Sequence, residues 1–150
     1  IDLSQGAVDK MIEAGLSASK KTIFNLSEEK FDTILLLMNG IGLAETIDQL
    51  DTFLLQLKKI LSPNGKIYCD STDLAYLYQE DDGSILLDLN ARYYGEMKFK
   101  MKYKNAESNW FSWLFIDFEN LTDHANSVGL KCTFVEEGDS NNYLVCLEHD

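Results

Sequence analysis

The chain has 150 residues, of which 45% are hydrophobic and 25% charged, which is typical of a folded domain and excludes disordered and collagen-like chains. Its 13 basic and 25 acidic residues give a formal net charge of −12, so most of its surface would repel a nucleic acid or an anionic membrane. The apolar run at 34–38 is far shorter than the ~20 residues that cross a bilayer. We therefore expect one cytoplasmic domain over 1–150, with neither nucleic acid nor membrane as a partner.

The cysteines and histidines show no pattern of disulfides or metal ligands. Cys69, Cys132 and Cys146 are odd in number, widely spaced and flanked by apolar or strand-forming residues. This favours small buried side chains in a reducing compartment. His124 and His149 have no cysteine or carboxylate at ligand spacing, so we expect no metal site.

The first third of the chain predicts a helix and then a buried strand. Ser4 precedes apolar residues at helical spacing, which predicts a capped helix over 5–14. Residues 22–26 favour a short β segment. Residues 31–38 end in a continuous apolar run, as expected of a central parallel strand covered by helices on both faces.

The next stretch predicts a strand–helix–strand crossover. An apolar stripe predicts a helix over 46–61, and Thr46 with Gln49 fits a capping box at its start. Residues 62–65 contain proline and glycine and break the helix, and 66–70 follow as a strand. Such a unit places its two strands parallel in one sheet with the helix across a face.

A longer mixed region follows, with a turn predicted at 81–84. Apolar and polar residues alternate over 96–103, which indicates a half-exposed antiparallel strand, and we expect 110–116 to be its partner. The two strands form a predicted hairpin over about 95–117.

The chain ends with a predicted helix and two strands. Asp117 is the expected cap of a short helix that stops at Gly129. Strands are predicted over 130–136 and 143–148, joined by a turn-rich segment. The last strand is apolar from 143 to 147, so we expect it inside the sheet and not at its rim.

The order of these elements and three short stretches together resemble the class I, Rossmann-like S-adenosylmethionine-dependent methyltransferases over nearly the whole chain. In 1–8 (IDLSQGAV), Asp2 stands where that family has an acidic residue after its second strand. Residues 31–42 (FDTILLLMNGIG) are similar to its fourth strand and following loop. Residues 61–68 (LSPNGKIY) are similar to its helix-to-strand turn of the type L-x-P-G-G-x-hydrophobic.

The resemblance implies an α/β, Rossmann-like three-layer sandwich. Its sheet would be mostly parallel, with an antiparallel last strand between the fifth and sixth strands and with the hairpin as an insertion. No glycine-rich turn of the form G-x-G-x-x-G joins a strand to a helix, so we expect the chain to lack the family's first strand and glycine-rich loop. That absence would expose apolar strand edges, which predicts self-association, a swapped or rearranged sheet, or a displaced N-terminal segment.

The resemblance also implies S-adenosylmethionine as the cofactor of the intact protein and a small molecule or a protein as the methyl acceptor. Catalysis would rest on holding donor and acceptor in line, so no catalytic residue is named, and the chain by itself is expected to be inactive and a poor cofactor binder. The expected cofactor contacts are Asp2, Leu3, Ser4, Thr22, Ile23, Met38, Asn39 and Gly40. The expected substrate contacts are Asp70, Ser71, Asp73, Trp110 and Trp113.

Structural alternatives remain open for these residues. Asp2 is also favourable beside a helix start, and Asn39 and Gly40 also suit a plain turn. Asp70, Ser71 and Asp73 are as well suited to cap the following segment, and Trp110 and Trp113 to pack the hairpin onto the domain. A lysine stripe (Lys98, Lys100, Lys102 and Lys104) either protects a strand edge or recognises an acidic partner. The alternative function is therefore a non-catalytic α/β interaction module that uses the hairpin, and a different Rossmann-like enzyme is a third possibility.

Overall fold

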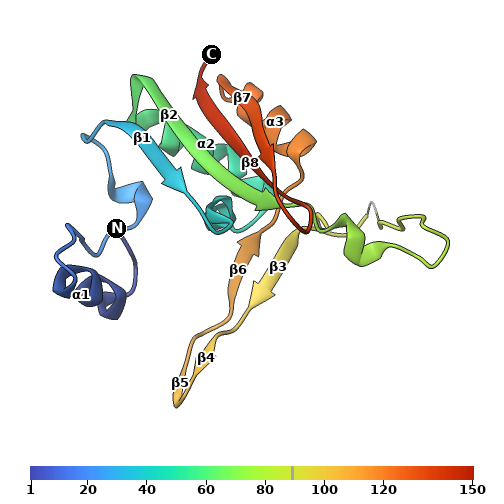
Figure 1. Ribbon diagram of the computed structural model, residues 1–150, viewed down its shortest axis with the longest axis horizontal. Coiled ribbons are helices and arrows are strands. Elements are labelled where there is room, and N and C mark those ends of the chain that lie inside the picture. Colours follow the sequence, from blue (N-terminus) through green and yellow to red (C-terminus); the bar gives the residue numbers. More distant parts are fainter. Residues whose placement is uncertain (89) are drawn as a thin grey trace.

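The computed structural model describes residues 1–88 and 90–150 (Figure 1). The helices are α1 (Gln5–Glu13), α2 (Ile47–Ile60) and α3 (Phe118–Ser127), with 3-10 turns η1 (Ile23–Asn25), η2 (Gly40–Ala44) and η3 (Ala75–Tyr78). The strands are β1 (Phe31–Leu36), β2 (Leu61–Thr72), β3 (Glu96–Phe99), β4 (Lys102–Tyr103), β5 (Ala106–Glu107), β6 (Phe111–Leu114), β7 (Leu130–Glu137) and β8 (Asn142–His149).

The main sheet has the strand order β1-β2-β8-β7. β1 and β2 are parallel, and β8 is antiparallel to both β2 and β7. Ile67 of β2 lies opposite Ile34 on one side and Leu147 on the other, so the strands share one apolar row. The parallel crossover and the interior, antiparallel position of the last strand, both predicted from the sequence, are confirmed.

Helices α2 and α3 lie side by side and cover one face of this sheet. Phe53, Leu54 and Leu57 of α2 and Leu121 of α3 are fully buried in the core. The Lys58 ammonium donates a hydrogen bond to the carbonyl of Val128 at 2.7 Å, which ties the end of α2 to the end of α3. This packing positions the carboxyl ends of β1 and β2 on a rigid support.

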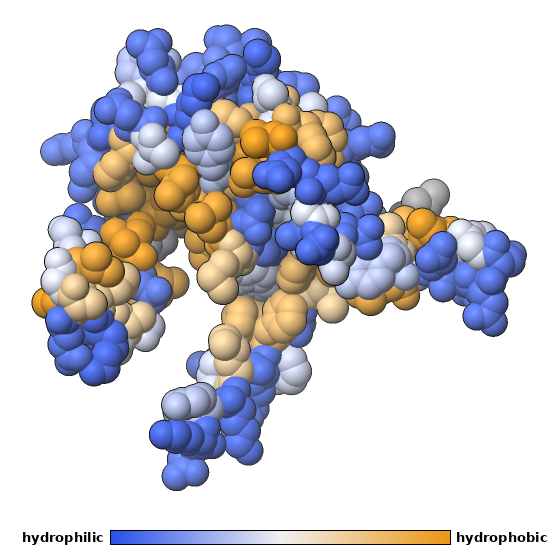
Figure 2. Space-filling view, in the orientation of Figure 1, coloured by the Kyte–Doolittle hydropathy of each residue, from blue (hydrophilic) through white to orange (hydrophobic). Residues whose placement is uncertain are grey.

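The opposite face of β1 is open, which corrects the prediction of a strand covered on both faces. Leu36 is 8% exposed, whereas its neighbour Leu35 on the other face is 60% exposed. Figure 1 shows α1 beyond the outer edge of β1, away from the sheet, and Figure 2 shows hydrophobic surface across the uncovered face. Within the described residues β1 pairs with a strand on one side only, and the helices form a second layer without a third.

The N-terminal segment contains the first predicted helix and an isolated parallel β-bridge. The Ser4 hydroxyl accepts a hydrogen bond from the amide of Ala7 and caps α1, as predicted. The amide of Asp2 donates to the carbonyl of Ser19 at 3.3 Å, and Asp2 forms a parallel bridge with Lys20. The two extended segments on either side of α1 therefore run alongside each other.

The β segment predicted at 22–26 is wrong, because these residues form η1. The hydroxyl of Thr22 accepts a hydrogen bond from the amide of Phe24, a local bond that competes with strand pairing. The side-chain amide of Gln56 on α2 donates to the carbonyls of Ile23 and Leu26 at 2.9 and 2.6 Å. These backbone groups are thus satisfied by a helix and not by a neighbouring strand.

Two predicted boundaries around α2 also differ from the structure. The Thr46 side chain makes no capping hydrogen bond, and the amide of Ile47 donates instead to the carboxylate of Glu96 at 3.1 Å. Residues 62–65, predicted as a break, lie within β2, whose register shifts between the pairs Phe31–Leu61 and Thr33–Lys66. Both differences arise from contacts with residues distant in sequence.

The predicted pairing of residues 96–103 with 110–116 is found in part. β3 pairs antiparallel with β6, and β4 pairs with β5 in a separate short ladder. The ladder is interrupted where the hydroxyl of Ser108 accepts a hydrogen bond from the amide of Met101 at 2.9 Å. In Figure 1 these strands project from the body as a narrow arm.

No helix among the described residues is long and apolar enough to span a bilayer.

Candidate active site

The loop at the carboxyl end of β1 has an unusual backbone. Met38 and Asn39 have φ angles of 60° and 57°, so two consecutive non-glycine residues adopt the left-handed conformation. Such residues are uncommon and cluster at functional sites, where the surrounding structure holds them. The Met38 side chain is 90% exposed, whereas Asn39 is 8% exposed. The loop therefore presents one residue to solvent and anchors the next in the core.

Asn39 is anchored by hydrogen bonds from all its polar groups. Its amide donates to Asp70 Oδ2 at 3.0 Å, and its Nδ2 donates to the carbonyl of Leu114 at 2.9 Å. Its Oδ1 accepts from the Ser71 hydroxyl at 2.9 Å, and its carbonyl accepts from Trp113 Nε1 at 3.1 Å. One buried side chain thus ties the loop after β1 to β2 and β6.

Ser71, a predicted substrate contact, is fully buried. Its hydroxyl donates to Asn39 and accepts from the amide of Ile116 at 2.9 Å. The hydroxyl therefore uses its donor and an acceptor position within the protein, and we assign Ser71 a structural role.

Glycine allows the loop to pack tightly against its neighbours. A Cβ atom at Gly40 would lie 2.9 Å from Leu36 Cβ, and one at Gly42 would lie 2.1 Å from Nε1 of Trp113. Trp113 is half-buried, with its ring over Gly42 and its Nε1–H bonded to Asn39. Trp113, predicted to contact substrate, thus covers the loop from the β6 side.

Asp70 lies beside this loop with one carboxylate oxygen unpaired. Oδ2 accepts from the amide of Asn39, whereas Oδ1 is buried and has no hydrogen-bond partner among the described residues. Cys69 and Ser71 point into the core, so Asp70 and Thr72 lie on the other face of β2. A buried carboxylate oxygen without a donor is energetically costly.

A cluster of two tyrosines and two aspartates lies where β2 and α3 meet. Asp117 Oδ2 accepts from the hydroxyls of Tyr93 and Tyr94 at 2.6 and 3.0 Å. The Tyr94 hydroxyl also lies 2.8 Å from Asp73 Oδ1, which accepts the amide of Ala75 as well. Asp73, a predicted substrate contact, thus accepts the first amide of η3. No residue spacing pointed to the two tyrosines, because their partners lie more than twenty positions away.

Electrostatics within this cluster follow from burial and hydrogen bonding. Burial raises the pKa of the Tyr93 hydroxyl, and its bond to Asp117 adds to the effect. Burial alone would raise the pKa of Asp117, but hydrogen bonds from the amide of Asn120 and from Tyr93 outweigh it and leave that pKa below its usual value. Asp117 therefore stays ionised and caps α3.

The predicted cofactor contacts at the N-terminus have local roles. Asp2 is half-buried, and its Oδ1 accepts from the amide of Ser4 at 2.7 Å. Ser4 and Thr22 cap α1 and η1, and Ile23 packs against the core, whereas Leu3 is 66% exposed. Figure 1 places the N-terminus on the free side of β1. No hydrogen bond among the described residues joins Asp2 to the loop at Met38.

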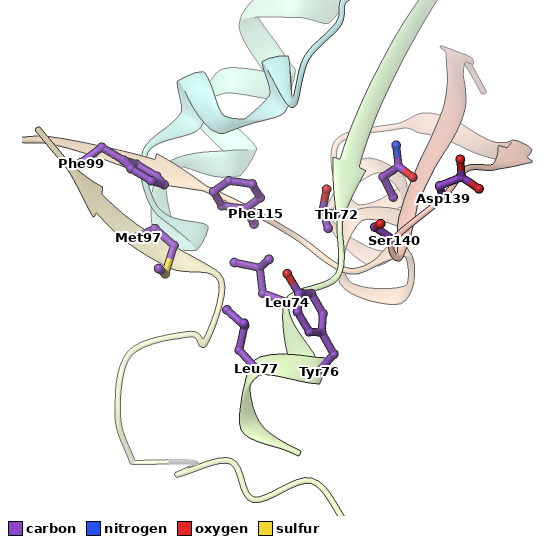
Figure 3. Close-up of a pocket in the computed structure, with 10 residues that line it drawn as sticks. Thr72, Leu74, Tyr76, Leu77, Met97, Phe99, Phe115, Asp139 and Ser140 are labelled. Carbon is purple, nitrogen blue, oxygen red and sulfur yellow. The ribbon is translucent and has the colours of Figure 1, made fainter. Parts of the chain in front are cut away.

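A groove with a volume of about 430 Å³ opens at the carboxyl end of β2 (Figure 3). Its apolar residues come from η3 on one side and from the hairpin on the other. Trp110, predicted to contact substrate, is 67% exposed and lies outside this lining. The residues that line it are Thr72, Leu74, Tyr76, Leu77, Met97, Phe99, Phe115, Asp139, Ser140 and Asn142.

The lysine stripe is partly neutralised within the hairpin. Lys100 forms an ion pair with Glu107 at 2.7 Å, and Lys102 lies opposite the same glutamate across the β4–β5 ladder. The ammonium of Lys104 lies over the ring of Tyr103. These contacts account for much of the stripe without a partner.

Cys69 and Cys146 are buried, as predicted, whereas Cys132 is only half-buried, and all three thiols are free. Burial raises the pKa of the Cys69 thiol, so it stays protonated and unreactive. In the described part of the chain no group of three or more His, Cys, Asp or Glu side chains is placed to hold a metal.

Comparison with known proteins gives matches among solved structures. The chain is similar to an S-adenosylmethionine-dependent methyltransferase from Bacteroides fragilis, crystallised with S-adenosyl-L-homocysteine, at 36% identity and a TM-score of 0.89. The match covers 99% of this chain and 61% of that one. No protein-family model matches the sequence. No curated protein sequence matches it either.

More distant matches share the fold. A methyltransferase from Clostridium acetobutylicum is 16% identical with a TM-score of 0.65, over 99% of this chain and 73% of that one. The sugar N-methyltransferase KedS8 from a Streptoalloteichus species is 12% identical with a TM-score of 0.61, over 99% of this chain and 69% of that one. The β1-β2-β8-β7 order with an interior antiparallel strand agrees with the arrangement that the sequence resemblance implied. The chain therefore has the fold of the class I S-adenosylmethionine-dependent methyltransferases.

Proposed function

We propose that the protein transfers a methyl group from S-adenosylmethionine to a small-molecule or protein acceptor. The observation that carries the proposal is the left-handed pair Met38 and Asn39, held rigidly at the carboxyl end of β1. Ligands of open α/β sheets bind outside the carboxyl ends of the strands. The relative that is 36% identical holds S-adenosyl-L-homocysteine, and the chain spans 61% of that relative's length.

Residues of the N-terminal segment and of the loop after β1 have side chains that suit such a cofactor. The carboxylate of Asp2 is half-buried and bonded to the protein through Oδ1, which orients it to accept hydrogen bonds from the two hydroxyls of a ribose. The exposed Met38 offers an apolar contact. When bound, the cofactor supplies a methyl group made electrophilic by a sulfonium. The protein's part is to hold that methyl in line with the acceptor and to exclude water.

The catalytic assembly depends on how the Asp2 segment meets β1. Within the described residues no backbone ladder joins them, and Leu35 and Leu37 on β1 and its continuation are 60% and 54% exposed. We infer that the 150 residues by themselves bind the cofactor weakly, transfer methyl groups poorly and self-associate through this edge. Free thiols at all three cysteines support a reducing, cytoplasmic location.

Calorimetric titration of the full-length protein with S-adenosyl-L-homocysteine tests the proposal. We expect Asp2→Asn to weaken binding about 10-fold or more, because the asparagine keeps an acceptor for Ser4 but loses a charged acceptor for the ribose. Asp9→Asn on α1 removes the same charge from an exposed position and is expected to leave binding unchanged. Absence of binding to the unmodified protein would overturn the proposal.

A further inference from the structure

The segment 38–47, which joins β1 to α2, has an unusual backbone at both ends. Its first two residues are left-handed. Near its end, Glu45 has a φ of 68° and a ψ of −48°, and the amide of Thr46 donates to the carbonyl of Ala44 at 2.8 Å. This is a γ-turn with positive φ, which is rare and strained for a residue other than glycine. The segment therefore keeps its conformation only where its surroundings hold it.

The hairpin formed by β3 and β6 holds the start of this segment. Trp113 Nε1 donates to the carbonyl of Asn39, and the same carbonyl accepts the amide of Gly42 at 3.0 Å, a bond that forms the 3-10 turn η2. Leu114, the next residue of β6, accepts a hydrogen bond from the side-chain amide of Asn39. Two neighbouring residues of β6 thus fix both the backbone and the side chain of Asn39.

The same hairpin holds the end of the segment. The amide of Ile47, the first residue of α2, donates to the carboxylate of Glu96 on β3, whereas Thr46 makes no side-chain cap. A carboxylate is favourable there, because the amino end of a helix carries partial positive charge. Glu96 lies directly opposite Leu114 in the β3–β6 ladder. The contacts at both ends of the segment therefore come from neighbouring positions of one two-stranded unit (Figure 1).

Packing fixes the ring of Trp113 in turn. The ring lies against Gly42, where a Cβ atom would come within 2.1 Å of Nε1. It also packs on the ring of Phe111, with centroids 6.2 Å apart and an interplanar angle of 82°. Phe99 of β3 packs on Phe111 at a centroid distance of 6.1 Å. Because these rings belong to both strands, the direction of the Nε1–H bond follows the position of the hairpin.

We propose that Trp113 and Glu96 are positioning residues, through which the β3–β6 hairpin clamps segment 38–47 in the conformation that receives the methyl donor. The inference rests on the proposed binding of S-adenosylmethionine at the carboxyl end of β1. Trp113 acts through the Asn39 carbonyl and Glu96 through the Ile47 amide, so neither role requires contact with the cofactor. Because the segment is strained at both ends, release of either end lowers the fraction of molecules that can bind the cofactor, and the apparent affinity falls with that fraction.

Amide hydrogen exchange, followed by NMR in the cofactor-free, full-length protein, tests the clamp. Trp113→Phe keeps an aromatic ring but removes the N–H donor, and Glu96→Ala removes the carboxylate. If one clamp holds both ends, each variant also affects the distant end, so we expect Trp113→Phe to speed exchange at Ile47 about 10-fold or more. We expect Glu96→Ala to do the same at Gly42, while amides of the β2–β8 ladder keep their protection. Trp110→Phe, the same change at a side chain that is 67% exposed, is the control and is expected to change neither end.

Calorimetric titration of the same variants with S-adenosyl-L-homocysteine tests the link to the cofactor. We expect Trp113→Phe and Glu96→Ala each to weaken binding about 5-fold or more. Glu96→Gln keeps an acceptor for the Ile47 amide and is expected to retain most of the affinity. Glu136→Ala, at an exposed position of β7, is expected to retain all of it. The double variant should bind little more weakly than the more affected single variant, because both changes release the same segment.

The outcomes separate the clamp from methyl transfer. If the unmodified protein does not bind S-adenosyl-L-homocysteine, methyl transfer is overturned, and hydrogen exchange still judges the clamp. Faster exchange confined to the end that each variant touches, or faster exchange throughout the sheet in both variants, overturns the clamp. Faster exchange at both ends with unchanged affinity overturns the positioning role. Losses of affinity that multiply in the double variant show two independent effects and overturn it as well.

Discussion

The hydroxyl of Ser71 donates a hydrogen bond to Oδ1 of Asn39 at 2.9 Å, and so joins the carboxyl ends of β1 and β2 inside the core. The same asparagine binds the carbonyl of Leu114, which brings in the end of β6. A left-handed loop and two strand ends are thereby fixed by one side chain.

Replacing Asn39 by glycine tests this anchor. Glycine adopts a φ of 57° without strain, so the change removes the side-chain bonds and leaves the backbone conformation accessible. Because Ser71 and Leu114 would lose their buried partner, we expect the free energy of unfolding in urea to fall by about 2–4 kcal/mol. Asn64→Gly, at an exposed position, is the control, and an equal loss there would contradict the assignment.

Gly42→Ala tests the contact between the loop and Trp113. The new Cβ would lie 2.1 Å from Trp113 Nε1, so the indole ring must move, and we expect a loss of about 1–3 kcal/mol in unfolding free energy. In a Trp113→Ala background, Gly42→Ala should cost less unfolding free energy, because the indole that the new Cβ meets is then absent. Gly6→Ala meets only an ordinary contact at 3.9 Å and should cost nothing. Additive losses in the double variant would count against the packing described.

Asp117 predicts a specific dependence of stability on acid. Burial opposes its ionisation, but hydrogen bonds from Asn120 and Tyr93 prevail and lower its pKa in the folded state. Its contribution is therefore fully present above about pH 4 and is lost as pH falls through the lower, folded-state pKa. Asp117→Asn keeps an N-cap acceptor but cannot titrate. Between pH 5 and pH 2, the free energy of unfolding in urea should fall less for the variant than for the unmodified protein. An equal fall with pH in both proteins would refute this role of Asp117.

The exposed edge of β1 predicts self-association of the 150 residues. Leu35 is 60% exposed on this edge strand, and a lysine there discourages pairing between sheets. We expect Leu35→Lys to shift sedimentation toward the monomer at micromolar concentration. Leu55→Lys changes a leucine that is 52% exposed on α2, away from the edge, and should leave association unchanged. Equal behaviour of the two variants would remove β1 as the contact.

Local patterns predicted much of this fold. The apolar stripe at 46–61, the cap at Asp117 and the continuous apolar run at 143–147 depend on neighbours in sequence, and each led to a correct element. The turn at 81–84 is also found, with Gly83 at a φ of 86°. Hydrophobic periodicity is a property of the segment itself, so one sequence is enough to read it.

The parts that sequence did not predict depend on distant partners. η1 is satisfied by Gln56, and the start of α2 by Glu96, so neither carries a local signal. The anchoring of Asn39 joins residues separated by 32 and 75 positions. The alternation of Met97 and Phe99 did indicate one buried face, but the η3 residues opposite them gave no sign of a groove.

Ultraviolet crosslinking of radiolabelled S-adenosylmethionine to the full-length protein, followed by peptide mapping, tests the central claim most directly. We expect label in the peptide that contains Met38–Gly40, and we expect it to be competed away by S-adenosyl-L-homocysteine and reduced in Asp2→Asn. Label confined to peptides of the hairpin or α3, or label that the competitor does not displace, would contradict it.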